Sequence, residues 1–235
     1  MAKKQRKPQY ITPTGIAVYP WLNKPDTKAF DDKPAKPQFK EKHRLTTAEF
    51  EKNNVVLCNG KVIETSLKDL IDEAAEEAFQ AALEENPKRQ KPRKGQVFRK
   101  HVPYSDELDD DGEETGNVLV SFSQNEEIKK KDGEIIKVKV PLFDRRGKPT
   151  DVAIYGGSKL KIAFTMRGFA NDAAYMAGVT LDISAVQVIE AQMSLRDAGS
   201  YGFGTEDDDE YEEAEEDEGN DQFSDEGSSD DEEEF

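Results

Sequence analysis

The sequence predicts a mainly β protein: a small Greek-key barrel of five or six strands with one amphipathic α-helix and a disordered acidic C-terminal tail. Several segments combine β-branched and aromatic residues with alternating apolar and polar positions, and one long segment repeats its apolar residues at helical spacing. A barrel is the natural closure for that inventory because it leaves no open sheet edge. A β-sandwich with a packed helix is the alternative that the pattern allows.

The first two predicted strands lie near the N-terminus. Residues 14–22, TGIAVYPWL, have the β-branched and aromatic content of a strand, and the polar, proline-containing residues 23–26 are expected to end it. Residues 39–46 form a second strand pattern, in which Phe39, Glu41, His43 and Leu45 alternate with charged residues.

The helix is predicted over residues 65–87, TSLKDLIDEAAEEAFQAALEENP, where apolar residues recur every three or four positions. Ser66 is a suitable N-cap, and Asn86–Pro87 stops the helix. Two charged segments follow, a basic run at 88–100 and an acidic loop at 105–116. Both are expected at the surface and outside the core.

The remaining strands are predicted in the second half of the chain, at 117–124, 134–144, 158–169 and 178–192. The first two are separated by a Lys-rich stretch that ends in Asp132–Gly133, a strong hairpin signal. In 158–169, apolar residues alternate with Lys, Thr and Arg, which predicts one buried and one partly cationic face. Phe122 and Phe164 lie in apolar alternation and are expected in the core.

Charge divides the chain into three parts: a basic arm at 1–9, a barrel domain at 10–196 and a disordered tail at 197–235. The net charge is −17, but 19 of the 50 acidic residues lie in 206–235, where there is no Lys or Arg. Residues 1–205 therefore hold 31 acidic against 33 basic residues and carry a net charge of +2. The tail has too few apolar residues to offset the entropy cost of folding.

Enzyme, metal and membrane functions are not expected. Cys58 is the only cysteine, and His43 and His101 are the only histidines, so neither a disulfide nor a zinc site is predicted. The YGGSKL segment lacks the spacing of a phosphate-binding loop, and no Ser/His/Asp or Cys/His set is evident. Without a long apolar run or a signal sequence, the protein is expected to act inside the cell, without cofactors.

Binding of single-stranded nucleic acid is better supported, because such proteins combine cations for the phosphates with rings on which bases stack. The body of the chain repeatedly places a ring close to a base in the sequence. Trp21 and Tyr104 in particular lie beside proline and polar residues, although rings on strands often belong to the core. The residues expected to contact DNA are Tyr19, Trp21, Arg99, Lys100, Tyr104, Phe143, Arg145, Arg146, Tyr155, Lys159, Lys161, Arg167 and Phe169.

Several motifs together resemble the replication single-stranded DNA-binding proteins of podovirus-type bacteriophages. They are YGGSKLKIAFTM at 155–166, the following GVTLDISAVQVIE, the Ala/Glu-rich helix with its Lys/Pro-rich sequel, the MAKK start and an acidic tail that ends in phenylalanine. The Gly-Gly-Ser-Lys-Leu-Lys core and the tail ending are the specific ones.

The resemblance implies an OB-fold that binds single-stranded DNA without sequence preference, in DNA replication, recombination and repair. It implies DNA contacts by Lys3 and Lys4 in the arm, and by Phe169 and Tyr175 in the loop after the Ser-Lys-Leu-Lys strand. It also implies that the tail recruits the replicative DNA polymerase and the primase-helicase in the cytoplasm of the bacterial host. The residues expected to bind these partners are Asp230, Asp231, Glu232, Glu233, Glu234 and Phe235.

Charge further suggests that the tail competes with DNA for the cationic groove, as a tethered polyanion. The sequence is compatible with a homodimer. Two other classes stay open: an acidic DNA mimic or chaperone that binds basic proteins, and an OB module that binds RNA through its 2′-hydroxyls.

Overall fold

The computed structural model describes residues 8–27, 36–93, 95–130 and 132–192. In chain order the elements are β1 (Tyr10–Ile11), β2 (Gly15–Asp26), β3 (Gln38–Thr46), α1 (Thr47–Phe50), β4 (Val55–Leu57), β5 (Val62–Ile63), α2 (Leu67–Glu85), the 3₁₀ helix η1 (Pro87–Gln90), β6 (Arg99–His101), β7 (Tyr104–Leu108), β8 (Glu114–Asn125), β9 (Glu127–Lys129), β10 (Ile135–Lys137), β11 (Leu142–Phe143), β12 (Lys159–Asn171) and β13 (Met176–Glu190). Within these residues, no helix is long and apolar enough to cross a membrane.

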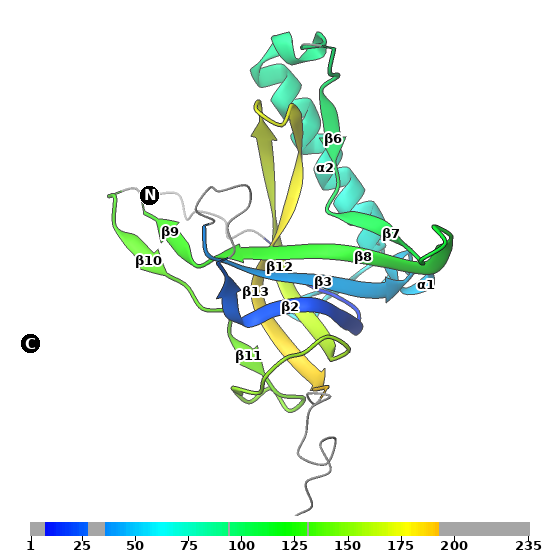
Figure 1. Ribbon diagram of the computed structural model, residues 1–235, viewed down its shortest axis with the longest axis vertical. Coiled ribbons are helices and arrows are strands. Elements are labelled where there is room, and N and C mark those ends of the chain that lie inside the picture. Colours follow the sequence, from blue (N-terminus) through cyan, green and yellow to red (C-terminus); the bar gives the residue numbers. More distant parts are fainter. Residues whose placement is uncertain (1–7, 28–35, 94, 131, 193–235) are drawn as a thin grey trace, which may run out of the picture. The chain divides into compact units, whose positions relative to one another are not determined.

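Five of the strands close into a barrel (Figure 1). β2 pairs with β3, β3 with β8, β8 with β13, β13 with β12, and β12 returns to β2. All these pairs are antiparallel except β8–β13, which is parallel at Phe122 and Leu181. This is the Greek-key order of an OB-fold, so the predicted mainly β barrel with one main helix is confirmed and the sandwich alternative is set aside.

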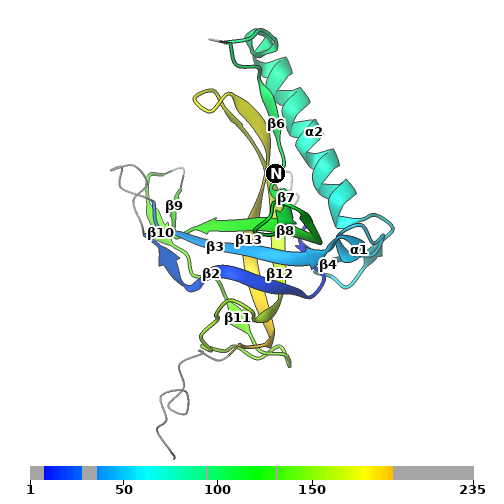
Figure 2. The same cartoon turned by 45° about the vertical axis from the view of Figure 1, so that its right-hand side comes forward.

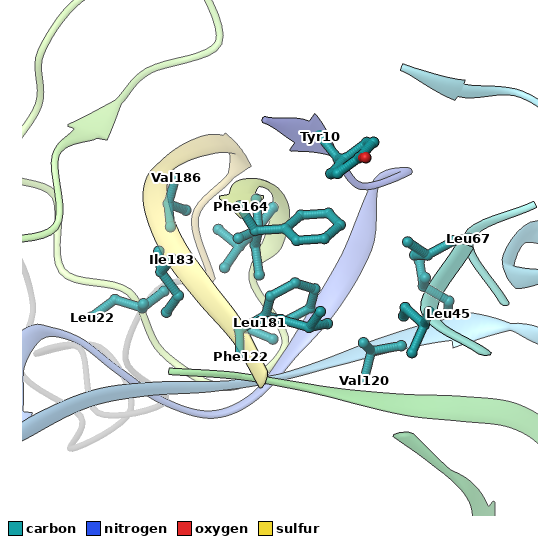
Figure 3. Close-up of a cluster of buried hydrophobic side chains, with 14 of the residues drawn as sticks. Tyr10, Leu22, Leu45, Leu67, Val120, Phe122, Phe164, Leu181, Ile183 and Val186 are labelled. Atoms are coloured by element: carbon teal, nitrogen blue, oxygen red, sulfur yellow. The ribbon is translucent and has the colours of Figure 1, made fainter. Parts of the chain in front are cut away.

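The barrel interior is filled by apolar side chains from all five strands (Figure 3). The rings of Phe122 and Phe164 meet edge to face, 5.2 Å between centroids, as expected of core residues. Gly15 allows β2 to cross β3 closely, because a Cβ at this position would lie 2.5 Å from the His43 ring. Each fully buried apolar side chain contributes about 1.5–3 kcal/mol, so this cluster is the main source of stability.

Helix α2 packs against the long β12–β13 hairpin and β6, as both ribbon views show (Figure 2). Ser66 caps it as predicted, its Oγ accepting a hydrogen bond from the Asp69 amide at 2.9 Å. Leu67, Ile71 and Ala75 form its buried face. The predicted helix is therefore confirmed, with ends within two residues of those expected.

Of the two charged segments that follow α2, the basic run was wrongly assigned to the surface alone. Phe98, in the basic run, is only 5% exposed and packs between Phe79 and Tyr175. Arg89 is also buried, because its guanidinium is satisfied by Asp172 and by the Ala82 carbonyl. The segment 105–116 lies at the surface as predicted, but it is mostly strand instead of loop: it contains most of β7 and the start of β8, and the turn between them is short.

Two predicted strand limits also differ from the structure. Residues 23–26 do not end the first strand, because β2 continues to Asp26, which pairs with Gln38. Residues 134–144 form two short strands instead of one, since β10 pairs with β9 whereas β11 pairs with β13. The Asp-Gly hairpin is present, between β9 and β10.

Candidate nucleic-acid interface

The outer face of the barrel over β2, β3 and β8 gathers cations on its central strand. Alternate side chains of β3 point to opposite sides of the barrel wall, and the buried side takes Phe39, Glu41, His43 and Leu45. The outer side therefore takes Lys40, Lys42 and Arg44. On β8, Ser121 lies opposite Lys42 and Ser123 opposite Lys40, so small side chains flank the lysines and leave the face open.

A β-bulge in β2 carries two aromatic rings to this face. Val18 pairs with Lys42 and Trp21 with Lys40, so Tyr19 and Pro20 together oppose the single residue Glu41. Tyr19 has a φ of 54°, a conformation that costs a non-glycine residue about 1–3 kcal/mol. Its side chain is 81% exposed, and that of Trp21 is 37% exposed. The strained backbone of the bulge thus holds a solvent-exposed ring beside the lysines.

These rings and lysines line a surface cavity of about 300 Å³. Its lining residues include Tyr19, Trp21, Lys40, Lys42, Ser121 and Ser123. The combination offers aromatic faces on which a planar base can stack and ammonium groups within reach of the adjoining phosphates. Its composition therefore matches what single-stranded nucleic acid requires.

The three cations of β3 differ in their pairing. Lys40 forms an ion pair with Asp26 at 3.1 Å, and Arg44 forms one with Glu107. Lys42, which lies between them, has no ion-pair partner among the residues that the structure describes. An unpaired cation can bind a phosphate without first breaking an internal contact, which makes Lys42 the most available member of the row.

Tyr155 joins the same region through the segment that precedes β12. The side chain of Asn23 bonds to Val152 O and Ile154 N, both at 2.9 Å. Gly157 N donates to Ala17 O at 2.9 Å, so this segment runs along β2 beside the bulge. Tyr155 lies within it and is 46% exposed. Three of the predicted ring residues are thereby brought to one stretch of β2.

A second group of predicted residues lies around β11. Phe143 pairs with Gln187, whose side-chain amide donates to the carbonyls of Asp144 and Arg145. Lys161 faces the same Gln187 across β12 and β13. Arg145 and Arg146 are exposed in the turn after β11, and Lys159 forms an ion pair with Glu190 at 2.7 Å.

A third group lies on the β12–β13 hairpin and β6. Arg99 and Lys100 are exposed on β6, where Lys100 pairs with Glu76 of α2 at 2.8 Å. Arg167 makes two hydrogen bonds to Asp182, and Phe169 contacts the His101 ring. Lys100 and Arg167 are therefore held by acidic neighbours.

Two predicted ring residues are integrated into the fold. Tyr175 is 6% exposed and its hydroxyl donates to Lys91 O, so its ring offers no free face to a base. The Tyr104 ring packs on Phe50. Its hydroxyl donates to Asp72 at 2.6 Å, and burial together with that carboxylate raises its pKa. Both rings therefore have a structural use. The predicted sites at Lys3, Lys4 and 230–235 lie outside the described residues.

Two ionisable side chains are sealed inside the barrel, on the inner side of β3. Glu41 is 1% exposed, and no hydrogen bond of normal geometry reaches either of its carboxylate oxygens. Burial raises its pKa to about 9, although the Val18 backbone partly stabilises the anion. Burial likewise lowers the pKa of His43 to about 4, against smaller opposing effects of Pro13 and Glu49. Both side chains are therefore neutral at pH 7 and add no charge to the outer face.

Sequence reasoning missed Lys40 and Lys42 as site residues. The signal was present, since both are charged residues that alternate with Phe39, Glu41 and His43 in a strand pattern. Their partner rings lie about twenty positions earlier in the chain, and only the β2–β3 register brings Trp21 opposite Lys40.

A closed five-stranded OB barrel with exposed rings and cations on its outer wall defines a nucleic-acid-binding protein. Residues 14–191 match the sequence profile of the family described as "Single-stranded DNA-binding protein, Bacteriophage T7", so the chain belongs to this family. The family consists of binding proteins, in keeping with the non-enzymatic function expected from the sequence.

Two solved structures are similar to this chain. The crystal structure of gp2.5, a single-stranded DNA-binding protein encoded by bacteriophage T7, superposes with a TM-score of 0.58 at 25% identity, covering 84% of this chain and 97% of that chain. The single-stranded DNA-binding protein of bacteriophage Enc34, solved in complex with single-stranded DNA, is 13% identical, with a TM-score of 0.49 and coverages of 83% and 97%. A search of curated proteins found no match.

Proposed function

We propose that this phage protein binds single-stranded DNA across the outer face of β2, β3 and β8. The observation that carries the proposal is the cavity lined by Tyr19, Trp21, Lys40 and Lys42, which places two exposed rings beside two lysines. Family membership supplies the class of ligand. Bases stack on the rings while the lysines, Lys42 above all, hold the phosphates.

This mode of binding is independent of sequence, because every base has a π-face and every nucleotide a phosphate. The exposed Tyr155 extends the path along β2, and the arginines at 145 and 146 offer further phosphate contacts beyond β11. The basic arm with Lys3 and Lys4, the domain limits at 10–196 and a homodimer stay predictions.

The acidic tail acts as a competitor for this face. Its 19 carboxylates contrast with a body of net charge +2, and a tethered polyanion has an effective concentration in the millimolar range. DNA displaces the tail, which then becomes available to the replicative DNA polymerase and the primase-helicase in the host cytoplasm. The tail thereby links the binding of DNA to the recruitment of these replication proteins.

Trp21 is the only tryptophan of the chain, so its emission reports directly on the proposed site. Oligo-dT, oligo-U and duplex DNA should be titrated against the full chain and against a chain without 206–235. We expect oligo-dT to quench the emission, and tail removal to tighten binding by about tenfold at low salt and to steepen its salt dependence.

Each alternative has its own signature in this titration. Equal affinity of both chains for oligo-dT at low salt contradicts the competition. A clear preference for oligo-U indicates an RNA-binding module. If the chain without 206–235 binds none of the oligonucleotides, the result favours an acidic protein that binds basic partners.

Replacing Phe235 by alanine is expected to leave DNA affinity unchanged and to weaken association with the replicative polymerase by at least fivefold. The reason is that one ring contributes little to a field made by 19 carboxylates, yet supplies the apolar contact that charge cannot. Surface plasmon resonance with immobilised polymerase measures the effect. Phe235→Tyr serves as the matched control, and unaltered polymerase binding by the alanine variant removes the assigned role.

A further inference from the structure

The Glu107 carboxylate occupies a complete anion-binding site next to the proposed DNA path. Arg44 donates from Nε to Oε1 at 2.8 Å and also bonds to it through Nη2. The second oxygen, Oε2, accepts from Asn117 Nδ2 at 3.0 Å and from Thr115 Oγ1 at 3.1 Å. A guanidinium, an amide and a hydroxyl are also the side-chain donors that proteins use to bind DNA phosphates.

This set of donors lies on the outer face, in line with the two lysines. Arg44 follows Lys42 on the same side of β3, about 6–7 Å further along the strand. Asn117 pairs with Thr46 and lies at the same end of the β3–β8 ladder. The row Lys40, Lys42 and Arg44 is therefore continuous, and its last member is held by Glu107.

Glu107 lies at an irregular position of β7. It lies at the register shift of β7, between Asp106, which pairs with Val118, and Leu108, which pairs with Glu114. The donor groups come from β3 and β8, the two central strands of the face. A rotation of the Glu107 side chain would therefore vacate the site without moving its donors.

The carboxylate stays charged throughout the neutral range. Burial alone would raise the pKa of Glu107, but hydrogen bonds from Arg44, Asn117 and Thr115 outweigh it and bring the pKa below its usual value. Only another anion, and not a change of pH near neutrality, removes Glu107 from its donors.

We propose that Arg44, Thr115 and Asn117 form a phosphate-binding subsite for single-stranded DNA, which the Glu107 carboxylate of the same chain fills until DNA displaces it. The inference rests on the proposed DNA path and adds an internal competitor within the folded body. Binding at this subsite requires an exchange of one anion for another, so the occupied subsite lowers the affinity for DNA.

The test is a double-mutant cycle measured by anisotropy of a labelled oligo-dT. Glu107→Gln removes the charge and keeps one of the two acceptor oxygens, so it also weakens the hold of the donors on this side chain. We expect it to tighten binding by about threefold to tenfold at low salt, and to increase the salt slope by about 0.7, the value of one added phosphate contact on a single strand. Glu134→Gln, in the turn between β9 and β10, makes the same change of charge outside β2, β3 and β8 and likewise frees a cation, Lys130; it is expected to have less than half this effect in logarithmic units.

Arg44→Ala completes the cycle. In the otherwise unchanged chain it should weaken binding by about twofold to fivefold, because it removes a phosphate contact and leaves the Glu107 carboxylate without its cationic partner. Combined with Glu107→Gln it should cancel the gain. Thermal unfolding of each variant confirms that the fold is kept.

Two results overturn the subsite: a gain from Glu107→Gln no larger than that from Glu134→Gln, or a gain that persists in the double variant. Lys42→Ala separates this failure from a failure of the proposed DNA path. If Lys42→Ala weakens binding, the path stands whatever happens at Glu107, and if it has no effect, the path itself is wrong.

Discussion

Replacing Glu41 by leucine is expected to raise the free energy of unfolding by about 3 kcal/mol at pH 7. In the folded protein the pKa of Glu41 is raised from 4.5 to about 9, because its carboxyl is buried. Between these two pH values the unfolded chain has released the proton and the folded chain still holds it. The contribution of Glu41 to the free energy of unfolding therefore falls as the pH rises from about 4.5 to about 9, and leucine removes this loss.

Urea unfolding at pH 5, 7 and 9 measures the effect: the difference in the free energy of unfolding between the leucine variant and the wild type should grow along this series. His43 provides an internal control. The pKa of His43 in the folded protein is lowered to about 4. Its contribution to the free energy of unfolding is therefore fully present above pH 6.5 and is lost as the pH falls toward 4, equally in both proteins. A leucine variant that is less stable at pH 9 than the wild type would contradict the burial of a neutral acid.

The same substitution tests which side of β3 binds DNA. Glu41 lies between Lys40 and Lys42 in the sequence but on the inner side of the barrel wall. The Glu41→Leu variant should therefore bind oligo-dT with unchanged affinity. Loss of binding would mean that the inner side of β3 also influences the binding of DNA.

Alternation within 39–46 predicted the strand but not which side faces inward. A glutamate and a histidine on the apolar side look like surface residues, because isolated ionisable groups rarely lie in a core. Their burial results from closure of the barrel, which depends on the parallel pairing of Phe122 with Leu181, 59 residues apart in the chain. No local pattern contains that contact.

In the site too, some residues could be predicted from their sequence neighbours and others only from contacts between distant segments. Neighbouring rings and bases in the sequence identified Tyr19, Trp21 and Tyr155, which the fold brings to one stretch of β2. The family resemblance selected Tyr175, which α2 and the basic run cover, because a resemblance between loop sequences does not reveal what packs above a ring. Lys40 and Lys42 required the β2–β3 register.

Removing both bulge rings, by Tyr19→Ala with Trp21→Ala, is expected to lower the affinity for oligo-dT by about 100-fold or more, since each stacked base contributes about 1–3 kcal/mol. Anisotropy of a labelled oligonucleotide measures the loss, because the variant has no tryptophan. Tyr19→Phe with Trp21→Phe keeps both aromatic faces and should bind within about threefold of the wild type.

Tyr19→Gly separates the ring from the strain of its backbone. Glycine adopts a φ of 54° without the cost that tyrosine bears, so this variant should be as stable as the wild type or more so. Its affinity for DNA should nevertheless fall by about fivefold or more, as expected for one lost stack. A glycine variant that binds DNA normally would mean that the bulge serves the barrel alone. A stable variant that binds weakly would instead explain why the chain keeps a tyrosine in a conformation that favours glycine: the strained backbone presents the ring to DNA.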